Sequence, residues 1–378
     1  MILGIDASNL RSGGAITHLS ELLREADPSN YGFTKIILWG EASMLSKIED
    51  RPWLVKVHEP LLDKSLPHRL FWQKFKVSKL ARNANCNMIF IPSGIILGDF
   101  KPVVTMSHNL LPFQWGEIKR YGPSWQMLRN VLLNLIQSFS FKKADGMIFL
   151  SNFAQKTIMN RIKKLTGSVT IIPHGVHKVF SFPPGQVLPI KDYSNENPFR
   201  IIYISTIDMY KHQWNVAEAI AGLRSLGYPI ELELIGSAYP KALAKLEEVT
   251  GRVDPQRTFI KYLGSIDHSK LPEHYAKSHL CLFASSCENM PNILLEGMSS
   301  GLSIACSDRG PMKEVLGDAG LYFDPTNPRN IADCVRTLID SPELRAKNAS
   351  ASFNRVQSYS WKTCAQDTFK FFQKVGLK

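Results

Sequence analysis

Residues 283–308 read FASSCENMPNILLEGMSSGLSIACSD, and this stretch decides the fold. It continues an apolar run over 280–284, breaks into small polar residues, and enters a helical pattern that Gly301 ends. A further apolar run begins at Ile304. Strand, turn and helix in this order build an open α/β sheet, whose ligands bind beyond the carboxyl ends of the strands. The sequence therefore predicts a ligand site at the turn over 285–291.

Two carboxylates stand eight positions apart in this stretch, Glu288 on the turn and Glu296 about one turn into the helix. The free N–H groups at the start of a helix suit a phosphate, which would repel a carboxylate, so each Glu is expected to face hydroxyl groups. Phosphate together with a polyol indicates a nucleotide sugar. Two solvated helix residues would give the same spacing, but Glu296 lies between apolar neighbours, where a charge needs a partner.

The motif Glu288, NMPNILL, Glu296, GMSSG resembles that of the retaining glycosyltransferases of family 4. Their hallmark is Glu, seven residues, Glu, then a small-residue helix and Gly. The resemblance covers essentially the whole chain and implies the GT-B fold, an α/β architecture of two doubly wound, Rossmann-like parallel-sheet domains that face a central cleft. Many members have a Gly-rich turn after the first Glu, where this chain has Met-Pro-Asn over 290–292.

Composition sets the class of protein before any motif is considered. The 378 residues are enough for two or three domains, and 44% of them are hydrophobic, as in a globular protein. The net charge of +12 suggests nucleic acid, an anionic membrane surface or a phosphorylated substrate as partner. No CxxC or Cys/His cluster occurs among the six cysteines, so we expect no zinc site and no disulfide framework.

Apolar runs alternate with helical patterns along the chain, which indicates parallel sheets with right-handed crossovers. We expect an N-terminal, acceptor-side domain over 1–180, a Pro-rich linker over 181–198, and a C-terminal nucleotide-sugar-binding domain over 199–359. The resemblance implies that a last helix, about 360–378, packs back on the first domain. The predicted strands are 2–6, 34–38, 53–57, 88–91, 103–106, 147–150, 169–172, 199–204, 231–235, 259–263, 280–284, 303–306 and 321–323.

The first domain offers a glycine loop and a histidine as candidate contacts. Gly13 and Gly14 lie between the first strand and its helix, where the missing Cβ lets a ligand approach the backbone, although an ordinary turn has the same pattern. His108 follows the strand over 103–106 and could equally be a satisfied loop residue. The resemblance places the glycine loop beside the donor phosphates and the acceptor, and the histidine beside the donor sugar.

Lys211 lies on the turn after the first strand of the second domain, where sequence alone would make it one solvated lysine among many. The resemblance implies a Lys on the donor diphosphate, with an Arg five positions earlier in many members. Thr206 occupies that earlier position here, so diphosphate binding is expected to depend more on Lys211. No metal-ligand cluster occurs in the sequence, so Lys211 and the helix N-terminus would stabilise the leaving diphosphate.

The resemblance also assigns the remaining donor contacts. Glu296 would accept hydrogen bonds from the ribose, and Glu288 would hold hydroxyl groups of the donor sugar. The turns at Gly236 and Leu263 would hold the base through backbone groups. The predicted catalytic residues are Glu288, His108 and Lys211, and the predicted donor-binding residues are Gly13, Gly14, Lys211, Gly236, Leu263, Glu288, Asn292, Ile293 and Glu296.

Residues 64–82 (KSLPHRLFWQKFKVSKLAR) carry six Lys or Arg and no acid, with apolar residues between them. The pattern is typical of a basic amphipathic helix that lies on an anionic membrane. A domain helix with a solvated basic face would look the same. A helix over 125–141, followed by Lys142 and Lys143, could widen the basic surface. Nucleic acid is not expected as a partner, because no nucleic-acid-binding motif occurs.

These observations and the resemblance together predict a retaining glycosyltransferase. It would move a hexose or deoxyhexose from a nucleotide-diphosphate sugar to a hydroxyl of a lipid-linked glycan in polysaccharide or O-antigen biosynthesis. We expect it to need neither cofactor nor metal and to act in the cytoplasm, on the cytoplasmic face of the inner membrane. Asp6 interrupts the N-terminal apolar run, so no signal peptide is expected. The alternatives are a nucleotide-sugar epimerase, a sugar phosphorylase, or a non-catalytic membrane-associated partner subunit.

Overall fold

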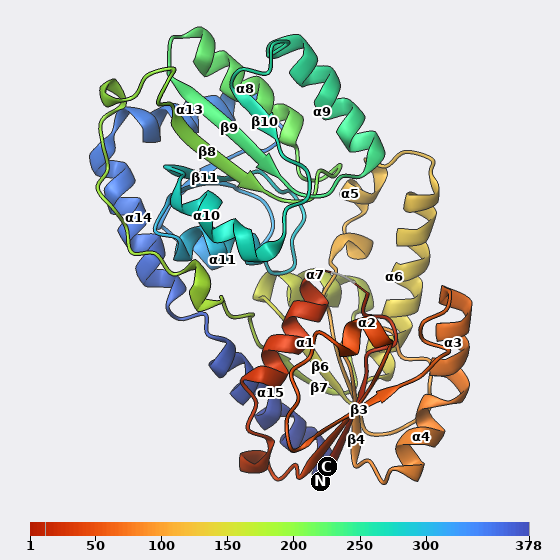
Figure 1. The fold of residues 1–378 in the computed structure, drawn as a ribbon. Helices are drawn as coiled ribbons and strands as arrows, with labels where there is room; N and C mark the ends of the chain where they lie inside the picture. The colour runs from red at the N-terminus through yellow and green to blue at the C-terminus, as the bar shows by residue number, and fades with distance from the viewer. Residues whose placement is uncertain (12, 378) are drawn as a thin grey trace. The chain divides into compact units, whose positions relative to one another are not determined.

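The computed structural model of the protein describes residues 1–11 and 13–377, which form two compact units (Figure 1). Unit 1 comprises 1–115, Pro123–Gly175 and the chain from Ser360 onward. Unit 2 comprises Gly116–Gly122 and Val176–Tyr359. Each unit is built on one parallel sheet, which confirms the predicted class of two doubly wound α/β domains.

Unit 1 contains a seven-stranded sheet in the order β3-β2-β1-β4-β5-β6-β7, with every neighbouring pair parallel. Its central strands are almost entirely buried, as expected of a sheet covered by helices on both faces (Figure 1). The strand order reverses between β1 and β4. The strands are β1 Ile2–Asp6, β2 Lys35–Gly40, β3 Leu54–His58, β4 Met88–Ile91, β5 Val103–Met106, β6 Gly146–Phe149 and β7 Ser168–Ile171.

The helices of unit 1 follow the predicted pattern except over 64–82. That stretch is two helices, because the backbone leaves helical geometry at Lys76, with φ −109° and ψ −43°. Trp72 and Val77, on either side of the break, are buried in the hydrophobic core with β4. The helices are α1 Gly14–Arg24, α2 Ala42–Leu45, α3 Leu66–Phe75, α4 Val77–Asn83, α6 Trp125–Lys143, α7 Asn152–Ile162 and α15 Trp361–Gly376.

Unit 2 contains a six-stranded sheet in the order β10-β9-β8-β11-β12-β13, again parallel throughout. The order reverses between β8 and β11, and such a switch point is where open α/β sheets bind ligands. All six strands agree closely with the predicted ranges. They are β8 Phe199–Ile204, β9 Ile230–Ile235, β10 Ile260–Tyr262, β11 Leu280–Phe283, β12 Ser303–Ser307 and β13 Leu321–Phe323.

Side-chain caps start several helices of unit 2. Asn327 accepts hydrogen bonds from the N–H groups of Arg329 and Asn330, and the Ser341 hydroxyl accepts one from Leu344. These caps satisfy donors that the first helical turn leaves free. The helices are α8 Gln213–Ser225, α9 Pro240–Val253, α10 Leu271–Ala276, α11 Asn292–Ser299, α12 Met312–Leu316, α13 Pro328–Asp340 and α14 Pro342–Val356, with the short α5 Trp115–Lys119 at the boundary of the units.

The predicted linker over 181–198 is fastened to unit 2 by hydrogen bonds. The guanidinium of Arg345, which is 1% exposed, donates to the carbonyls of Leu188 and Leu338. The N–H of Phe182 donates to the carbonyl of Ser299 at 3.0 Å. Buried donors of this kind hold the segment in one course, because leaving them unpaired is costly. No helix in the described part of the chain is long and apolar enough to cross a membrane.

Gly301, which ends α11, should not tolerate a side chain. Its φ is +66°, and a Cβ would lie 2.7 Å from the Pro184 nitrogen and against the Phe182 carbonyl oxygen. We expect Gly301→Ala to lower the free energy of unfolding by more than about 1 kcal/mol. Gly222→Ala is the matched control, because this helical glycine has open space around it and the change should stabilise by about 1 kcal/mol. Urea unfolding measures both, and equal effects of the two variants would contradict the prediction.

Candidate active site

A buried ion pair joins the two strands that flank the switch point of unit 2. Lys211, on the turn after β8, donates through Nζ to Oε1 of Glu288, on the turn after β11. The side chains are 10% and 15% exposed. Nζ also lies 5.1 Å from the ring centre of Tyr210 and 5.2 Å from that of Phe283. The structure thus brings together two residues 77 positions apart, both predicted from sequence, at the carboxyl edge of the sheet.

Backbone and side-chain hydrogen bonds hold these two turns together. The N–H of Ser286 donates to the Tyr210 carbonyl at 2.8 Å, and the Ser286 hydroxyl lies 2.9 Å from Nε2 of His212. The Tyr203 hydroxyl donates to the Lys211 carbonyl at 2.7 Å. Burial, with a further contribution from the positive charge of Arg120, lowers the pKa of His212 to about 3. The imidazole is therefore neutral at physiological pH and acts as a hydrogen-bonding strut.

Glu296 lies inside α11 and is only partly satisfied. Its Oε1 is 3.1 Å from Nε2 of His268, while its buried Oε2 has no hydrogen-bond partner among the described residues. Burial raises the pKa of this carboxyl, opposed by the hydrogen bond with His268. A buried carboxylate oxygen without a donor is unfavourable, so this oxygen is positioned to accept a hydrogen bond from a ligand.

The neighbouring turns of unit 2 pack backbone against backbone. Gly236 follows β9 with φ +149°, and a Cβ there would meet the carbonyl oxygen of Ser205, so only glycine fits. The N–H of Gly236 donates to the Gly264 carbonyl at 2.8 Å. Leu263, which follows β10, is 42% exposed. The structure places Gly236 and Leu263 on adjacent turns at the carboxyl edge, as their positions after strands predicted.

Asn292 and Ile293 form the first turn of the eight-residue helix α11. Pro291 precedes the helix without a side-chain cap. Both residues come directly after the turn that carries Glu288, so their backbone N–H groups belong to the helix end that would face a phosphate. Their position in the fold therefore agrees with the sequence prediction, and their contacts with a donor remain a proposal.

Unit 1 holds a cluster of three histidines at the carboxyl ends of its strands. The ring centres of His18 and His108 are 5.0 Å apart, and those of His18 and His174 are 4.8 Å apart. Burial, and secondly the neighbouring His174, lowers the pKa of His108 to about 3. The Nε2 atom of His108 is buried and has no hydrogen-bond partner among the described residues. His108 is thus a neutral imidazole with one ring nitrogen available.

The glycine loop of unit 1 lies at the start of α1. Gly13 has φ +74°, which glycine adopts at little cost, and a Cβ there would meet nothing within 4 Å. Gly14 is the first residue of the helix, and both glycines are exposed. Backbone conformation, rather than packing, therefore favours glycine at 13. Three of the predicted site residues lie in unit 1, and the others lie in unit 2.

Sequence reasoning missed a segment that packs on the turns of unit 2. Residues 116–122 contribute Tyr121, whose hydroxyl donates to Oδ1 of Asp208 at 2.7 Å, and Glu117, which accepts from the Ser286 hydroxyl at 2.8 Å. Burial raises the pKa of Asp208. The segment precedes Asp208 by 87 positions and has no motif, so no sequence signal indicated the contact. His268, the partner of Glu296, was missed for the same reason.

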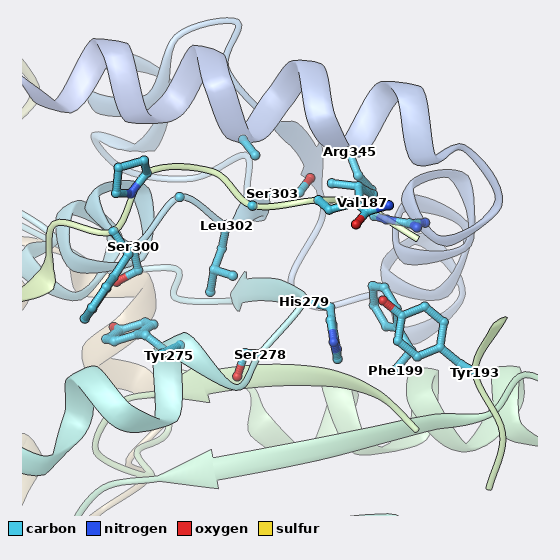
Figure 2. Close-up of a pocket in the computed structure, with 17 residues that line it drawn as sticks. Val187, Tyr193, Phe199, Tyr275, Ser278, His279, Ser300, Leu302, Ser303 and Arg345 are labelled. Carbon is cyan, nitrogen blue, oxygen red and sulfur yellow. The ribbon is translucent and has the colours of Figure 1, made fainter. Parts of the chain in front are cut away.

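A separate cavity of about 420 Å³ lies at the other edge of the unit 2 sheet. Figure 2 shows it between the linker and the start of strands β11 and β12, with Tyr193, Phe199 and His279 grouped on one side. Because parallel α/β sheets bind ligands at their carboxyl edge, this cavity is not the predicted site. Within residues 1–11 and 13–377, no three His, Cys, Asp or Glu side chains are grouped to hold a metal ion.

Comparison with known proteins places this geometry in a family. Residues 189–355 match the family model for glycosyl transferases group 1, so this part of the chain belongs to that family, and the resemblance found in the sequence is confirmed. The O-antigen chain mannosyltransferase B of Escherichia coli is 28% identical over 115 residues, which are 30% of each chain. The chain spans 51% and 55% of the lengths of two further curated relatives.

Solved structures show the same fold over nearly the whole chain. Sucrose-phosphate synthase from Thermosynechococcus elongatus superposes with a TM-score of 0.75 at 16% identity, over 99% of this chain and 98% of that one. Anabaena Alr3699/HepE in complex with UDP and glucose superposes with a TM-score of 0.71 at 16% identity, over 99% and 100%. Likeness at this level of identity establishes the fold, which is the expected GT-B architecture.

The buried His108 should make the protein sensitive to acid. Its pKa is about 3 in the folded protein and about 6.5 in an unfolded chain, so the unfolded state binds more protons once the pH falls below about 6.5. The free energy of unfolding should therefore fall by about 2 kcal/mol between pH 7 and pH 5 on account of this group alone.

The variant His108→Gln removes that term. Urea unfolding at the two pH values should show that the variant loses about 2 kcal/mol less than the wild type on acidification. His18→Gln should act in the same direction, because burial also lowers the pKa of His18. Equal pH dependence in the wild type and both variants would show that the histidines are not held neutral by burial.

Proposed function

We propose that the protein is a retaining glycosyltransferase of family 4 that uses a nucleotide-diphosphate sugar as donor. One observation carries the proposal: at the switch point of unit 2, a buried Lys211 cation and the carboxylate of Glu288 lie side by side, with Glu296 on the helix that follows. The cation suits a diphosphate, and the carboxylates suit hydroxyl groups. HepE, which shares the fold, is known in complex with UDP and glucose.

Lys211 would stabilise the departing diphosphate. Its ammonium lies in a site that is largely shielded from water, where a charge-assisted hydrogen bond is worth about 1.5 to 3 kcal/mol. The start of α11, with Asn292 and Ile293, adds backbone N–H groups and the positive end of the helix dipole. Thr206 cannot replace the Arg of many family members, so Lys211 is the cation on which diphosphate binding depends.

The two glutamates would position the hydroxyl groups of the donor. In this proposal Glu288 leaves Lys211 for the diphosphate and accepts hydrogen bonds from the sugar. Glu296 accepts from the ribose through Oε2, the buried oxygen that lacks a donor in the protein. Gly236 and Leu263 hold the base with backbone groups.

Unit 1 would supply His108 and the glycine loop. Because His108 is neutral, it can donate a hydrogen bond to a sugar hydroxyl without adding a charge. Gly13 and Gly14 would let the donor phosphates or the acceptor come close to the backbone. Retention of anomeric configuration would follow if a donor phosphate oxygen takes the proton of the acceptor hydroxyl, so no protein base is assigned.

We propose a hydroxyl of a lipid-linked glycan as the acceptor and a hexose or deoxyhexose as the transferred sugar. The relative named O-antigen chain mannosyltransferase B supports a polysaccharide pathway. The reaction would take place on the cytoplasmic face of the inner membrane. An epimerase would convert the donor alone, and a phosphorylase would need inorganic phosphate, so both differ from a transferase in what they consume.

Binding of a panel of nucleoside diphosphates and their sugars tests the donor site. We expect one nucleotide to bind the wild-type protein tightly, and Lys211→Ala to weaken it by about 10- to 150-fold through loss of the charge-assisted hydrogen bond. Glu296→Ala should weaken the ribonucleotide by about tenfold or more, because the ribose hydroxyls lose their acceptor. Isothermal titration calorimetry measures both.

Lys270→Ala is the matched control, since this lysine is exposed and lies outside the predicted contacts. It should leave nucleotide binding unchanged. Absence of binding to every member of the panel would contradict the proposal, and binding of inorganic phosphate and free sugar instead would favour the phosphorylase. With the correct donor and acceptor, nuclear magnetic resonance of the product should show the anomeric configuration of the donor.

A further inference from the structure

Helix α6 presents its apolar residues to solvent. Six large side chains along it are exposed, with fractions from 38% to 72%. They recur at intervals of three, four, three, one and three positions, so at about 100° per residue they form a single stripe along the helix. We call this set the α6 stripe: Trp125, Leu128, Leu132, Leu135, Ile136 and Phe139.

The face of α6 that packs on unit 1 is largely polar. Asn130, Gln137 and Ser140 are buried there. The amide of Asn134 donates to the Pro112 carbonyl at 2.8 Å, and the Ser140 hydroxyl accepts from the N–H of Ile96 at 2.9 Å. A surface helix of a globular protein normally has the opposite arrangement, with apolar residues inside and polar ones outside. The inversion indicates that the stripe faces something other than water.

Basic residues border the α6 stripe. Arg129, Lys142 and Lys143 are on the same helix, which contains no Asp or Glu. Burial and the nearby positive charges of Lys74 and Lys101 lower the pKa of Lys143, so basic groups from three segments lie close together.

Helix α3 adds to the same surface. Phe71 and Phe75 are 52% and 64% exposed, with ring centres 5.0 Å apart. The residue Gly98 connects the elements, because its carbonyl accepts from Lys143 and its Cα lies against Ser78 of α4. Figure 1 shows α3, α4 and α6 on one side of the unit 1 sheet. The nearby acids are already paired, Asp99 with Arg82 and Asp145 with Lys101.

We propose that the α6 stripe and α3 form the surface by which the protein docks on a bilayer of anionic lipids. The apolar side chains would enter the boundary between headgroups and acyl chains, with α6 in the plane of the membrane. Lys74, Lys76, Lys79, Arg129 and Lys142 have no ion-pair partner among the described residues and would contact lipid phosphates. The inference is independent of the donor and its sugar, because it concerns the surface of unit 1 alone.

Charge favours a bilayer over a second copy of the chain. A symmetric dimer would set the same surface against itself, and the basic residues around the stripe would then face each other. Because α6 carries no acid, nothing on it would compensate them. An anionic bilayer supplies both the apolar layer that suits the stripe and the negative charge that suits its border.

Sedimentation with vesicles tests the proposal. The full chain should bind vesicles of equal parts phosphatidylcholine and phosphatidylglycerol, and bind phosphatidylcholine alone at least tenfold more weakly. Leu135→Gln combined with Phe139→Gln should reduce binding to the anionic vesicles at least tenfold. Arg129→Gln combined with Lys142→Gln should reduce it in proportion to the anionic lipid content, and high salt should abolish the difference from the wild type.

The matched control replaces two equally exposed apolar residues of unit 2, Val179→Gln combined with Leu226→Gln. It should bind vesicles as the wild type does. Unchanged thermal unfolding and nucleotide binding would show that the α6 variant is folded, and these readouts also separate a failure of this proposal from a failure of the donor site. Vesicle binding that survives the α6 changes, or a wild-type dimer in light scattering that ignores vesicles, would overturn the inference.

Discussion

The ion pair between Lys211 and Glu288 is the interaction on which the account of this protein depends. It spans the switch point of the unit 2 sheet, where strands β8 and β11 run side by side although 75 residues of chain separate the ends of one and the start of the other. Only a parallel sheet with crossover helices brings the two turns to one edge. Two oppositely charged groups that are both largely removed from water stabilise each other, but they also form a site prepared for a charged ligand.

Several polar groups around this pair are held in states that favour function over stability. Glu296 keeps a buried oxygen without a donor, and burial raises the pKa of its carboxyl. His108 and His212 are kept neutral by burial. Each arrangement costs free energy that an apolar residue would not, as is common where a protein binds a ligand. The α6 stripe is a similar exception on the surface, since it exposes apolar area that a helix usually buries.

Much of the fold could be predicted from the sequence because it depends on local patterns. Short apolar runs separated by helical periodicity located every strand to within a few residues, and the Glu288–Glu296 motif located the turn at the switch point. Long-range contacts could not be predicted. The hydrogen bond between Tyr121 and Asp208 joins residues 87 positions apart, and the pairing of His268 with Glu296 has no local signal. The break at Lys76 was also missed, because packing of Trp72 and Val77 into the core, and no Gly or Pro, sets it.

The measurement that tests the central claim most directly is calorimetric titration of the nucleoside diphosphate that the wild-type protein binds most tightly, with Glu288→Gln and Lys211→Met beside it. If Lys211 binds the diphosphate, Glu288 competes for it in the free protein. Glu288→Gln should then tighten diphosphate binding by about tenfold while abolishing sugar transfer, and Lys211→Met should weaken it by at least as much. Weaker diphosphate binding in both variants, to the same extent, would show that the pair acts as one structural unit and would contradict the account.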